Sequence, residues 1–362
     1  METVFILLPY ASAGFIVYFA YLFSFSIPVF VEFVYSRGIY PIFTRMDFLT
    51  ASLPFSLAEI LAYALLGWLA YYAVFTFRTL IKRNKKSLLR NLFFRLALLA
   101  VAASCLLALF VAGWAFNYAR MPLSASLGLD ASPASPEELY HLCQSLAGKA
   151  NHLRGKTLED AWGVYKMNKS KQQINTEVKN VFREYAPPFM NLGGETDVKG
   201  VATYNLLSGL NILGIFIPFT YEPNVNMQMP DLYFSSSALH EYAHFKGFAR
   251  EDEANFIAYY VSRNMPDTDF SYSSTMLALV HSMNQLANCS PGLYSRVYGA
   301  LSPAVQRDLD ANAAYWAQFK DTQQAVETMN NNYLKSNKQQ DGVQSYGRMV
   351  DLLIALMRAG GL

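Results

Sequence analysis

Residues 235–255 read SSSALHEYAHFKGFAREDEAN, and the HEYAH motif in this stretch decides how the whole chain is interpreted. Residues four positions apart share one face of a helix, so His240 and His244 can bind a single zinc ion. Glu241 follows the first histidine, where a carboxylate can act as general base on water and then as proton donor. The stretch therefore predicts a zinc-dependent hydrolytic site on one helix.

The flanking residues delimit this helix. Ser235, Ser236 and Ser237 come just before the motif and can cap the helix, and Gly247 can end it in the left-handed conformation. Intramembrane zinc proteases of the site-2 class carry the same motif inside a transmembrane helix. That placement is excluded here by the charged residues around the motif, which are Asp231, Lys246, Arg250 and Glu251.

A third protein ligand is expected soon after the motif. We favour Glu251, because Asn255 lies one helical turn later and can hold a ligand by a second-shell hydrogen bond. A tight turn at Gly247 would bring this second helix back across the first. Glu253 is the alternative third ligand. Without the motif beside it, this acidic cluster would be read as an ordinary solvated helix surface.

A peptide-cleaving site of this kind also needs an edge strand for the substrate backbone and a polar group for the developing oxyanion. Residues 216–220 can supply the strand. A lone histidine such as His281 is more often an ordinary helix residue than a catalytic one. The sequence leaves the substrate and oxyanion contacts open among Phe219, Thr220, Glu222, Asn224, Asn226, Tyr259, Tyr260, His281 and Tyr346.

The first third of the chain indicates a membrane anchor. Hydrophobic residues make up 53% of the 362 residues and charged residues only 15%. Three apolar stretches, Val4–Val34, Phe55–Phe77 and Leu92–Phe116, each exceed the roughly 20 residues that cross a bilayer. We predict three transmembrane helices in an anchor of residues 1–118. Glu59 is the one acidic residue near the start of the second span, and it can sit at the interface or pair inside the bundle.

Loop charges predict how the anchor is oriented. The loop between the second and third spans is strongly basic, whereas the loop before it has only Arg37 and Arg45. The positive-inside rule then puts the N-terminus in the cytoplasm and everything after the third span outside. The basic cluster is thus a contact for the lipid bilayer, and with a net charge of +2 no nucleic-acid partner is expected. Its residues are Arg78, Lys82, Arg83, Lys85, Lys86 and Arg90.

Residues 119–362 have regular charges and predict a mostly helical extramembrane domain with a small β element, so the fold class is mainly α. Residues 206–220 are apolar but too short and glycine-rich to span a bilayer, and are expected to be buried and partly β. Residues 329–341 are expected to be a helix end and loop. A Cys143–Cys289 disulfide is conceivable outside the cytoplasm. The expected helices are 137–150, 172–184, 235–247, 251–264, 273–287, 303–334 and 343–358.

The chain resembles a family of uncharacterised bacterial membrane proteins that is known only as a domain of unknown function and carries an HExxH zinc motif. This resemblance implies a multi-pass protein of the bacterial cell membrane. It is carried by Val34–Pro41, Pro54–Glu59, Asn117–Arg120, Gly214–Thr220, His240–Phe256 and Asp341–Arg348.

More loosely, Glu251 to Asn255 is similar to the Glu-x-x-Ala-Asp/Asn pattern of gluzincin proteases, whose first Glu is the third zinc ligand. The resemblance implies a zincin-like metallopeptidase domain with Glu251 as ligand. The sequence departs from that pattern by its short gap after His244 and by Asn in place of the commoner Asp.

Three functions are consistent with these features. The first is a zinc peptidase acting on peptides or proteins at the outer membrane face. The second is a membrane sensor or scaffold that keeps zinc for stability without catalysis. The third is a zinc amidase acting on cell-envelope substrates. The sequence does not separate peptide bonds from other amides.

Overall fold

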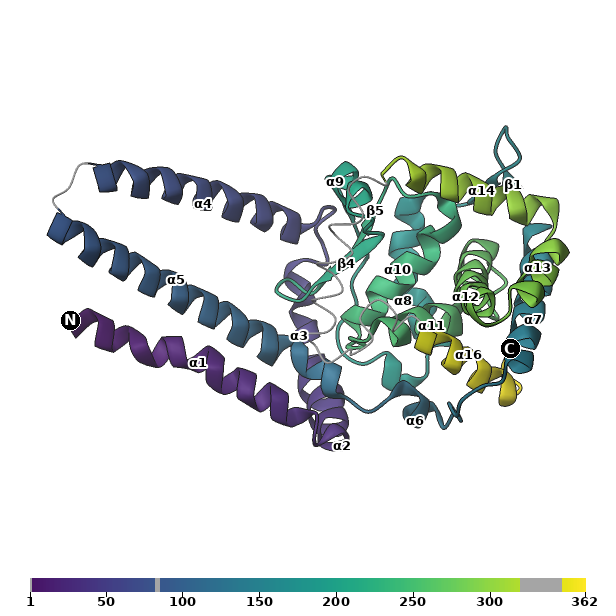
Figure 1. Ribbon diagram of the computed structural model, residues 1–362, viewed down its shortest axis with the longest axis horizontal. Coiled ribbons are helices and arrows are strands. Elements are labelled where there is room, and N and C mark those ends of the chain that lie inside the picture. Colours follow the sequence, from purple (N-terminus) through teal and green to yellow (C-terminus); the bar gives the residue numbers. More distant parts are fainter. Residues whose placement is uncertain (1, 82–84, 320–346) are drawn as a thin grey trace.

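The computed structural model describes residues 2–81, 85–319 and 347–362. Long helices extend from one side of a mostly helical body, which also contains the C-terminus (Figure 1). The long helices are α1 (Glu2–Ser24), α4 (Leu57–Ile81) and α5 (Lys85–Gly113). The expectation of a mainly helical protein with a small β element is confirmed.

Two helices are long and apolar enough to cross a membrane. Their candidate spans, Leu57–Arg78 and Leu92–Gly113, have 22 residues each. At 1.5 Å per residue such a helix is about 33 Å long, which matches a hydrocarbon core of about 30 Å. The expected first span is not one straight helix: α1 ends at Ser24, and the chain resumes at Pro28 with a bend of 107°. The structure thus has two candidate spans, or three if this bent pair counts as one.

Helix α1 packs along α5, while α4 diverges from both (Figure 1). The Gly14 amide donates to Ser104 Oγ at 2.9 Å, and a Cβ on Gly14 would lie 2.5 Å from that oxygen. A glycine is therefore required for this close approach. The C-terminal end of α4 and the N-terminal end of α5 both lie at the end of the bundle farthest from the body. The basic segment that begins at Arg78 and the helical body thus lie at opposite ends of the spans.

Short helices join the spans to the body, and we call residues 28–56 and 114–120 the juxtamembrane collar. Its buried Glu32 forms ion pairs of 2.8 Å with Arg120 and with Arg37. Arg120 also donates to the carbonyl oxygen of Gly247 at 2.8 Å, so the collar is bonded to the body. The collar elements are α2 (Pro28–Phe30), the π-helix η1 (Val31–Ile39), α3 (Tyr40–Thr44), η2 (Arg45–Leu49) and η3 (Ala115–Ala119).

Glu59 and Glu222 fix α4 to the body. The Glu59 carboxylate accepts hydrogen bonds from the backbone amides of Ala202 and Thr203, at 2.9 and 2.8 Å. Glu59 therefore bonds to the body rather than inside the helical bundle. Glu222 in turn accepts from the first amides of α4, those of Leu57 and Ala58.

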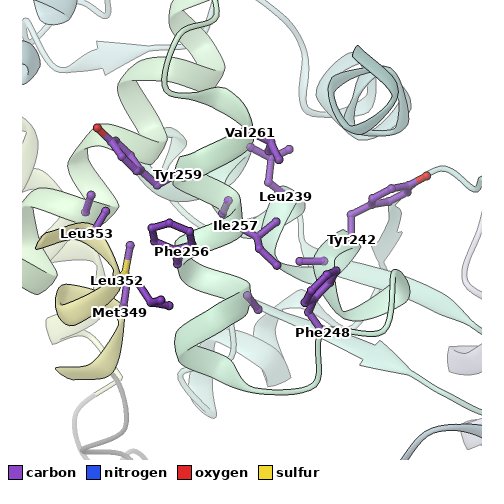
Figure 2. Packing of buried hydrophobic residues seen from close by; sticks show 14 of the residues in the cluster. Leu239, Tyr242, Phe248, Phe256, Ile257, Tyr259, Val261, Met349, Leu352 and Leu353 are labelled. Carbon is purple, nitrogen blue, oxygen red and sulfur yellow. The ribbon is translucent and has the colours of Figure 1, made fainter. Parts of the chain in front are cut away.

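The body is built around α12 (Thr268–Cys289), which packs against α7 (Pro136–Arg154), α10 (Asp231–Phe245), α11 (Glu251–Ser262) and α16 (Gly347–Arg358). Figure 2 shows the apolar side chains of α10, α11 and α16 meeting in one cluster, which fixes α10 against α11. The remaining helices are α6 (Leu123–Leu127), α8 (Lys171–Tyr185), η4 (Pro188–Met190), α9 (Tyr204–Gly209), α13 (Pro291–Ala300) and α14 (Pro303–Ala317).

The helices expected in the body are found, but residues 329–341 and the ends of two predicted helices fall outside the described residues. The α7 start is a capping box, in which Ser135 accepts from the Glu138 amide and Glu138 from the Ser135 amide. Cys143 and Cys289 are free thiols, so the conceivable disulfide between them is not formed.

Two small sheets complete the body. Strands β1 (Leu158–Glu159) and β2 (Tyr165–Lys166) form an antiparallel hairpin. The second sheet has the order β3-β5-β4, with β5 parallel to β3 and antiparallel to β4. The expected partly β segment thus divides into α9 and β4, and β4 is an edge strand. These strands are β3 (Lys199–Val201), β4 (Gly214–Ile217) and β5 (Glu222–Asn226).

The buried ion pair between Arg120 and Glu32 generates a stability prediction. Arg120→Ala would leave the Glu32 carboxylate buried without its main partner and remove the bond to Gly247. We expect the free energy of unfolding to fall by about 3–5 kcal/mol. Denaturant titration of the detergent-solubilised protein measures this loss.

Arg183→Ala is the matched control, because Arg183 forms an exposed ion pair with Glu195 on the body surface. That variant should unfold close to wild type, since exposed ion pairs contribute little. Equal stability of the two variants would contradict a structural role for the collar ion pair.

Candidate metal centre

The HEYAH residues lie in the C-terminal half of α10. This helix begins at Asp231, after Pro230, one turn earlier than expected. The prediction that Ser235, Ser236 and Ser237 cap it is therefore wrong, because all three are buried inside the helix. The Ser236 amide lies 3.0 Å from Ser273 Oγ of α12. Small side chains at these positions let α12 pack close behind the motif.

Gly247 ends α10, as predicted. Its φ of 88° lies in the left-handed region that a glycine adopts at no steric cost. The Gly247 amide donates to the His244 carbonyl at 2.8 Å, and the Phe248 amide donates to the Ala243 carbonyl at 3.1 Å. This pair of bonds is a Schellman motif. It reverses the chain within four residues, so Glu251 begins α11 directly beside the two histidines.

The structure brings His240, His244 and Glu251 together, with one ligand atom from each within 4.8 Å of the others. The Glu251 carboxylate oxygens lie 3.2 Å from His240 Nε2 and 3.6 Å from His244 Nε2. Ligands of a tetrahedral zinc ion, at bond lengths of about 2.0–2.1 Å, are separated by roughly 3.4 Å. Two imidazoles and one carboxylate at these separations fit a zinc ion and leave a fourth position for water.

Both histidines are oriented by hydrogen bonds on their far sides. His240 Nδ1 lies 2.8 Å from Asn255 Oδ1, and His244 Nδ1 lies 2.7 Å from the Phe248 carbonyl oxygen. Because both partners are acceptors, each Nδ1 carries the proton and each Nε2 presents a lone pair to the shared point. Asn255 thus supports His240, whereas the sequence had suggested only that it could support a ligand.

Glu253, the alternative third ligand, faces away from the histidines. Its Oε1 accepts from the Leu123 amide at 2.7 Å and from Arg250 at 2.5 Å. Residues two apart on a helix do not share a face, so Glu251 and Glu253 cannot both point at the motif. Glu253 instead joins the start of α6 to the start of α11.

Glu241 is buried, with 5% exposure, and its Oε2 has no hydrogen-bond partner among the described residues. Its Cγ lies 2.5 Å from where a Cβ on Gly214 would be, so β4 passes directly over this side chain. Burial raises the Glu241 pKa to about 7, against the charges of His240 and His244 and a backbone hydrogen bond at Phe216. An orphaned buried carboxylate oxygen is expected where a water molecule or a cation completes the site.

The electrostatics of the cluster also favour a cation. Burial opposes the charged form of His244, but the neighbouring Glu251 carboxylate outweighs it and raises the His244 pKa to about 9. Burial would likewise raise the Glu251 pKa, but His244 and His240 hold it well below its usual range. His244 therefore keeps a proton whose charge the Glu251 carboxylate balances, and a divalent metal ion can take the place of that proton.

His281 of α12 is electrostatically coupled to this cluster. Burial and, to a smaller extent, the charge of His240 together lower its pKa to about 4. His281 is thus neutral near pH 7. Of the candidate oxyanion groups within the described residues, it is the one whose pKa responds to a metal-site histidine.

Strand β4 has a free edge with which an extended peptide could pair. The Asn226 amide donates to the Leu213 carbonyl at 2.8 Å, which sets the antiparallel register with β5. Because successive residues of a strand alternate in the direction of their backbone groups, Gly214 and Phe216 turn theirs away from β5. They point out of the free edge of the sheet, where the Phe216 backbone bonds to Glu241.

The other candidate site residues are used elsewhere. Glu222 bonds to the amides that begin α4, and the Asn226 amide group bonds to Ser208 Oγ and to the Ile212 carbonyl. Asn224 likewise donates to backbone carbonyls of its own sheet, and the Tyr259 hydroxyl accepts from Lys149.

Phe219 and Thr220 lie in the turn between β4 and β5 rather than beside the histidines. The Tyr260 ring packs on the Phe256 ring and under the Arg263 guanidinium, away from the metal cluster. Tyr346 lies outside the described residues.

Two aromatic residues of the collar contact the site, and the sequence motifs did not reveal them. The Trp114 ring packs edge-on against the His244 ring, with centroids 6.1 Å apart, and lies 4.7 Å from the Phe216 ring. The Tyr40 hydroxyl donates to the Phe245 carbonyl at 3.1 Å. Trp114 follows the last residue of α5, so its position at the end of a predicted span was the available signal.

Comparison with known proteins identifies the family alone. A family model described as "protein of unknown function (DUF3810)" matches residues 35–354. No curated protein and no solved structure is detectably similar to the chain. The matched range contains α4, α5 and the whole candidate metal centre.

The ligand geometry predicts how metal content responds to substitution. We expect about one zinc ion per wild-type chain and a severe loss in Glu251→Ala, because that variant removes one of three ligands. Metal analysis by mass spectrometry on the purified full-length protein measures both. Glu253→Ala is the control and should keep its zinc, since that carboxylate bonds to Leu123 and Arg250. Loss of zinc in Glu253→Ala alone would contradict the assignment.

Proposed function

This chain belongs to the DUF3810 family of proteins of unknown function, and we propose that it is a membrane-anchored, zinc-dependent peptidase. The observation that carries the proposal is the convergence of His240, His244 and Glu251 next to a buried Glu241, all beside an edge strand. A zinc ion kept only for stability would need neither the orphaned carboxylate nor the exposed strand edge.

His240, His244 and Glu251 would hold the zinc ion, and their fixed Nδ1 hydrogen bonds reduce the cost of assembling the site. When bound, zinc lowers the pKa of water and polarises the substrate carbonyl. Glu241 takes the proton from the attacking water and delivers it to the leaving amine. A Glu241 pKa raised by burial suits both steps, because the group must accept and then release a proton near neutral pH.

The edge strand favours peptides over other amides as substrates. An extended peptide can pair with the outward-facing backbone groups of Gly214 and with the Phe216 carbonyl, while the Phe216 amide bonds to Glu241. Gly214 has no side chain to block such a strand, and the Glu241 side chain lies directly against it. A peptide bound there would pass the carboxylate that activates water. Lipid amides have no extended backbone that could use this edge.

His281 is our choice for the group that stabilises the developing oxyanion. It is neutral near pH 7, because burial and the charge of His240 lower its pKa, so it can donate a hydrogen bond. Thr220, in the turn that follows β4, is left as a substrate contact.

We further propose that the protein is a multi-pass protein of the bacterial cell membrane with its catalytic body outside the cytoplasm. The C-terminal end of α4 and the N-terminal end of α5, which carry Arg78, Lys85, Lys86 and Arg90, lie at the end of the spans opposite the body. The positive-inside rule assigns that end to the cytoplasm.

Glu241→Gln tests the mechanism. The amide cannot accept the proton of water, so hydrolysis of a mixed peptide library should fall about 10²–10⁴-fold while zinc content stays at the wild-type level. Product formation by mass spectrometry and metal analysis on the same preparation provide the two measurements. Glu137→Gln, an exposed change of the same chemistry at the start of α7, should keep full activity. Hydrolysis retained by zinc-loaded Glu241→Gln would rule out this role.

Reporter fusions test on which side of the membrane the helical body lies. A reporter that is active only outside the cytoplasm, fused after Leu362, should be active, and one that is active only inside should be silent. The reverse pattern would place the body in the cytoplasm and invert the proposed topology.

A further inference from the structure

The turn between β4 and β5 is attached to the ends of both candidate spans. The Glu222 carboxylate accepts from the amides of Leu57 and Ala58, the first residues of α4, at 3.0 and 2.7 Å. The Tyr221 hydroxyl donates to the carbonyl of Gly113, the last residue of α5, at 3.3 Å. Because both spans end at these residues, the turn at 218–220 lies level with the membrane surface.

Tertiary contacts hold this turn in place. Tyr221 has a φ of 53°, which is unfavourable for a bulky residue. Its ring packs against Tyr40, with centroids 6.2 Å apart, while its hydroxyl bonds to α5. The geometry of the turn is therefore imposed by the collar and the spans.

The surface around the turn suits a lipid interface. No charged residue occurs from Tyr204 to Tyr221. Within that segment Leu206, Ile215 and Phe219 are 58%, 39% and 53% exposed. Exposed apolar and aromatic side chains at the level of span ends are typical of residues that sit among lipid headgroups.

Strand β4 leads from this surface to the metal centre. Gly214 lies against Glu241, and Phe219 follows five residues later at the turn. At about 3.3 Å per extended residue, the two positions are at most roughly 17 Å apart, because β4 ends at Ile217 and the chain then turns. Trp114, which follows the end of α5, already contacts the His244 ring. Glu241 and the metal-site histidines therefore lie only a few residues along the chain from the surface that we assign to the bilayer.

We propose that the substrate is a polypeptide anchored in the same membrane, paired with the outer edge of β4 and cut within about five residues of the bilayer surface. This inference rests on the proposed peptidase function. Confinement to one membrane raises the effective concentration of such a segment without any further contact. A soluble peptide has no such advantage and would have to approach a strand whose far end is occupied by lipid.

The test uses full-length, zinc-loaded protein in vesicles of phosphatidylcholine and phosphatidylglycerol. The probe is an alanine–leucine transmembrane helix that carries an unstructured tail of mixed sequence on the side of the catalytic body. The same tail without the helix is the soluble comparison. We expect the anchored tail to be cut at least about tenfold faster, with cuts mapped by mass spectrometry within about five residues of the helix.

Two variants report on the turn through the ratio of anchored to soluble cleavage. Phe219→Ser should lower this ratio, because it removes the apolar side chain at the membrane surface. Trp162→Ser is the matched control and should leave the ratio unchanged, since Trp162 is 80% exposed on the β1–β2 hairpin, far from the spans (Figure 1).

The experiment distinguishes failure of this inference from failure of the proposed peptidase function. Equal rates for the two tails, cuts spread along the tail irrespective of distance, or an unchanged ratio in Phe219→Ser would overturn this inference and leave the peptidase proposal standing. No cleavage of either tail by the zinc-loaded enzyme would overturn both.

Discussion

The left-handed turn at Gly247 is the constraint on which the candidate metal centre depends. Only three residues separate it from Glu251, so the third ligand reaches the histidines only if the chain reverses at once. A Cβ at Gly247 would also lie 2.9 Å from the Tyr40 ring. Conformation and close packing thus both require glycine here. The Phe248 carbonyl, delivered by the same turn, orients His244.

The membrane anchor and the candidate site are one packed unit. Arg120 pairs with Glu32 in the collar and bonds to the Gly247 carbonyl, so a collar ion pair supports the turn that assembles the ligands. Trp114 extends the same support from the end of α5 to His244. The candidate spans and the candidate metal ligands are therefore held in place by shared contacts.

The sequence located the candidate site better than it located the site's supports. The pair His240 and His244, with Glu251 ranked above Glu253, follows from helical periodicity, which is a local property. Glu222 and Asn226 were chosen because they are polar and close to the expected strand. The structure uses both in hydrogen bonds that join the sheet to α4 and α9. The residues next to a polar side chain in the sequence do not determine which distant residue it bonds to in the folded protein.

By itself, the sequence determined the mainly helical fold, two of the three apolar spans that it predicted, the helix that carries the two histidines and its end at Gly247, because these depend on periodicity, length and the conformational freedom of glycine. Tertiary structure decided where the bent first helix breaks, which carboxylate of α11 meets the histidines, and that β4 passes over Glu241. It also placed Trp114 against His244, since contacts between residues far apart in the chain form only when α5, α10 and the small sheet pack together.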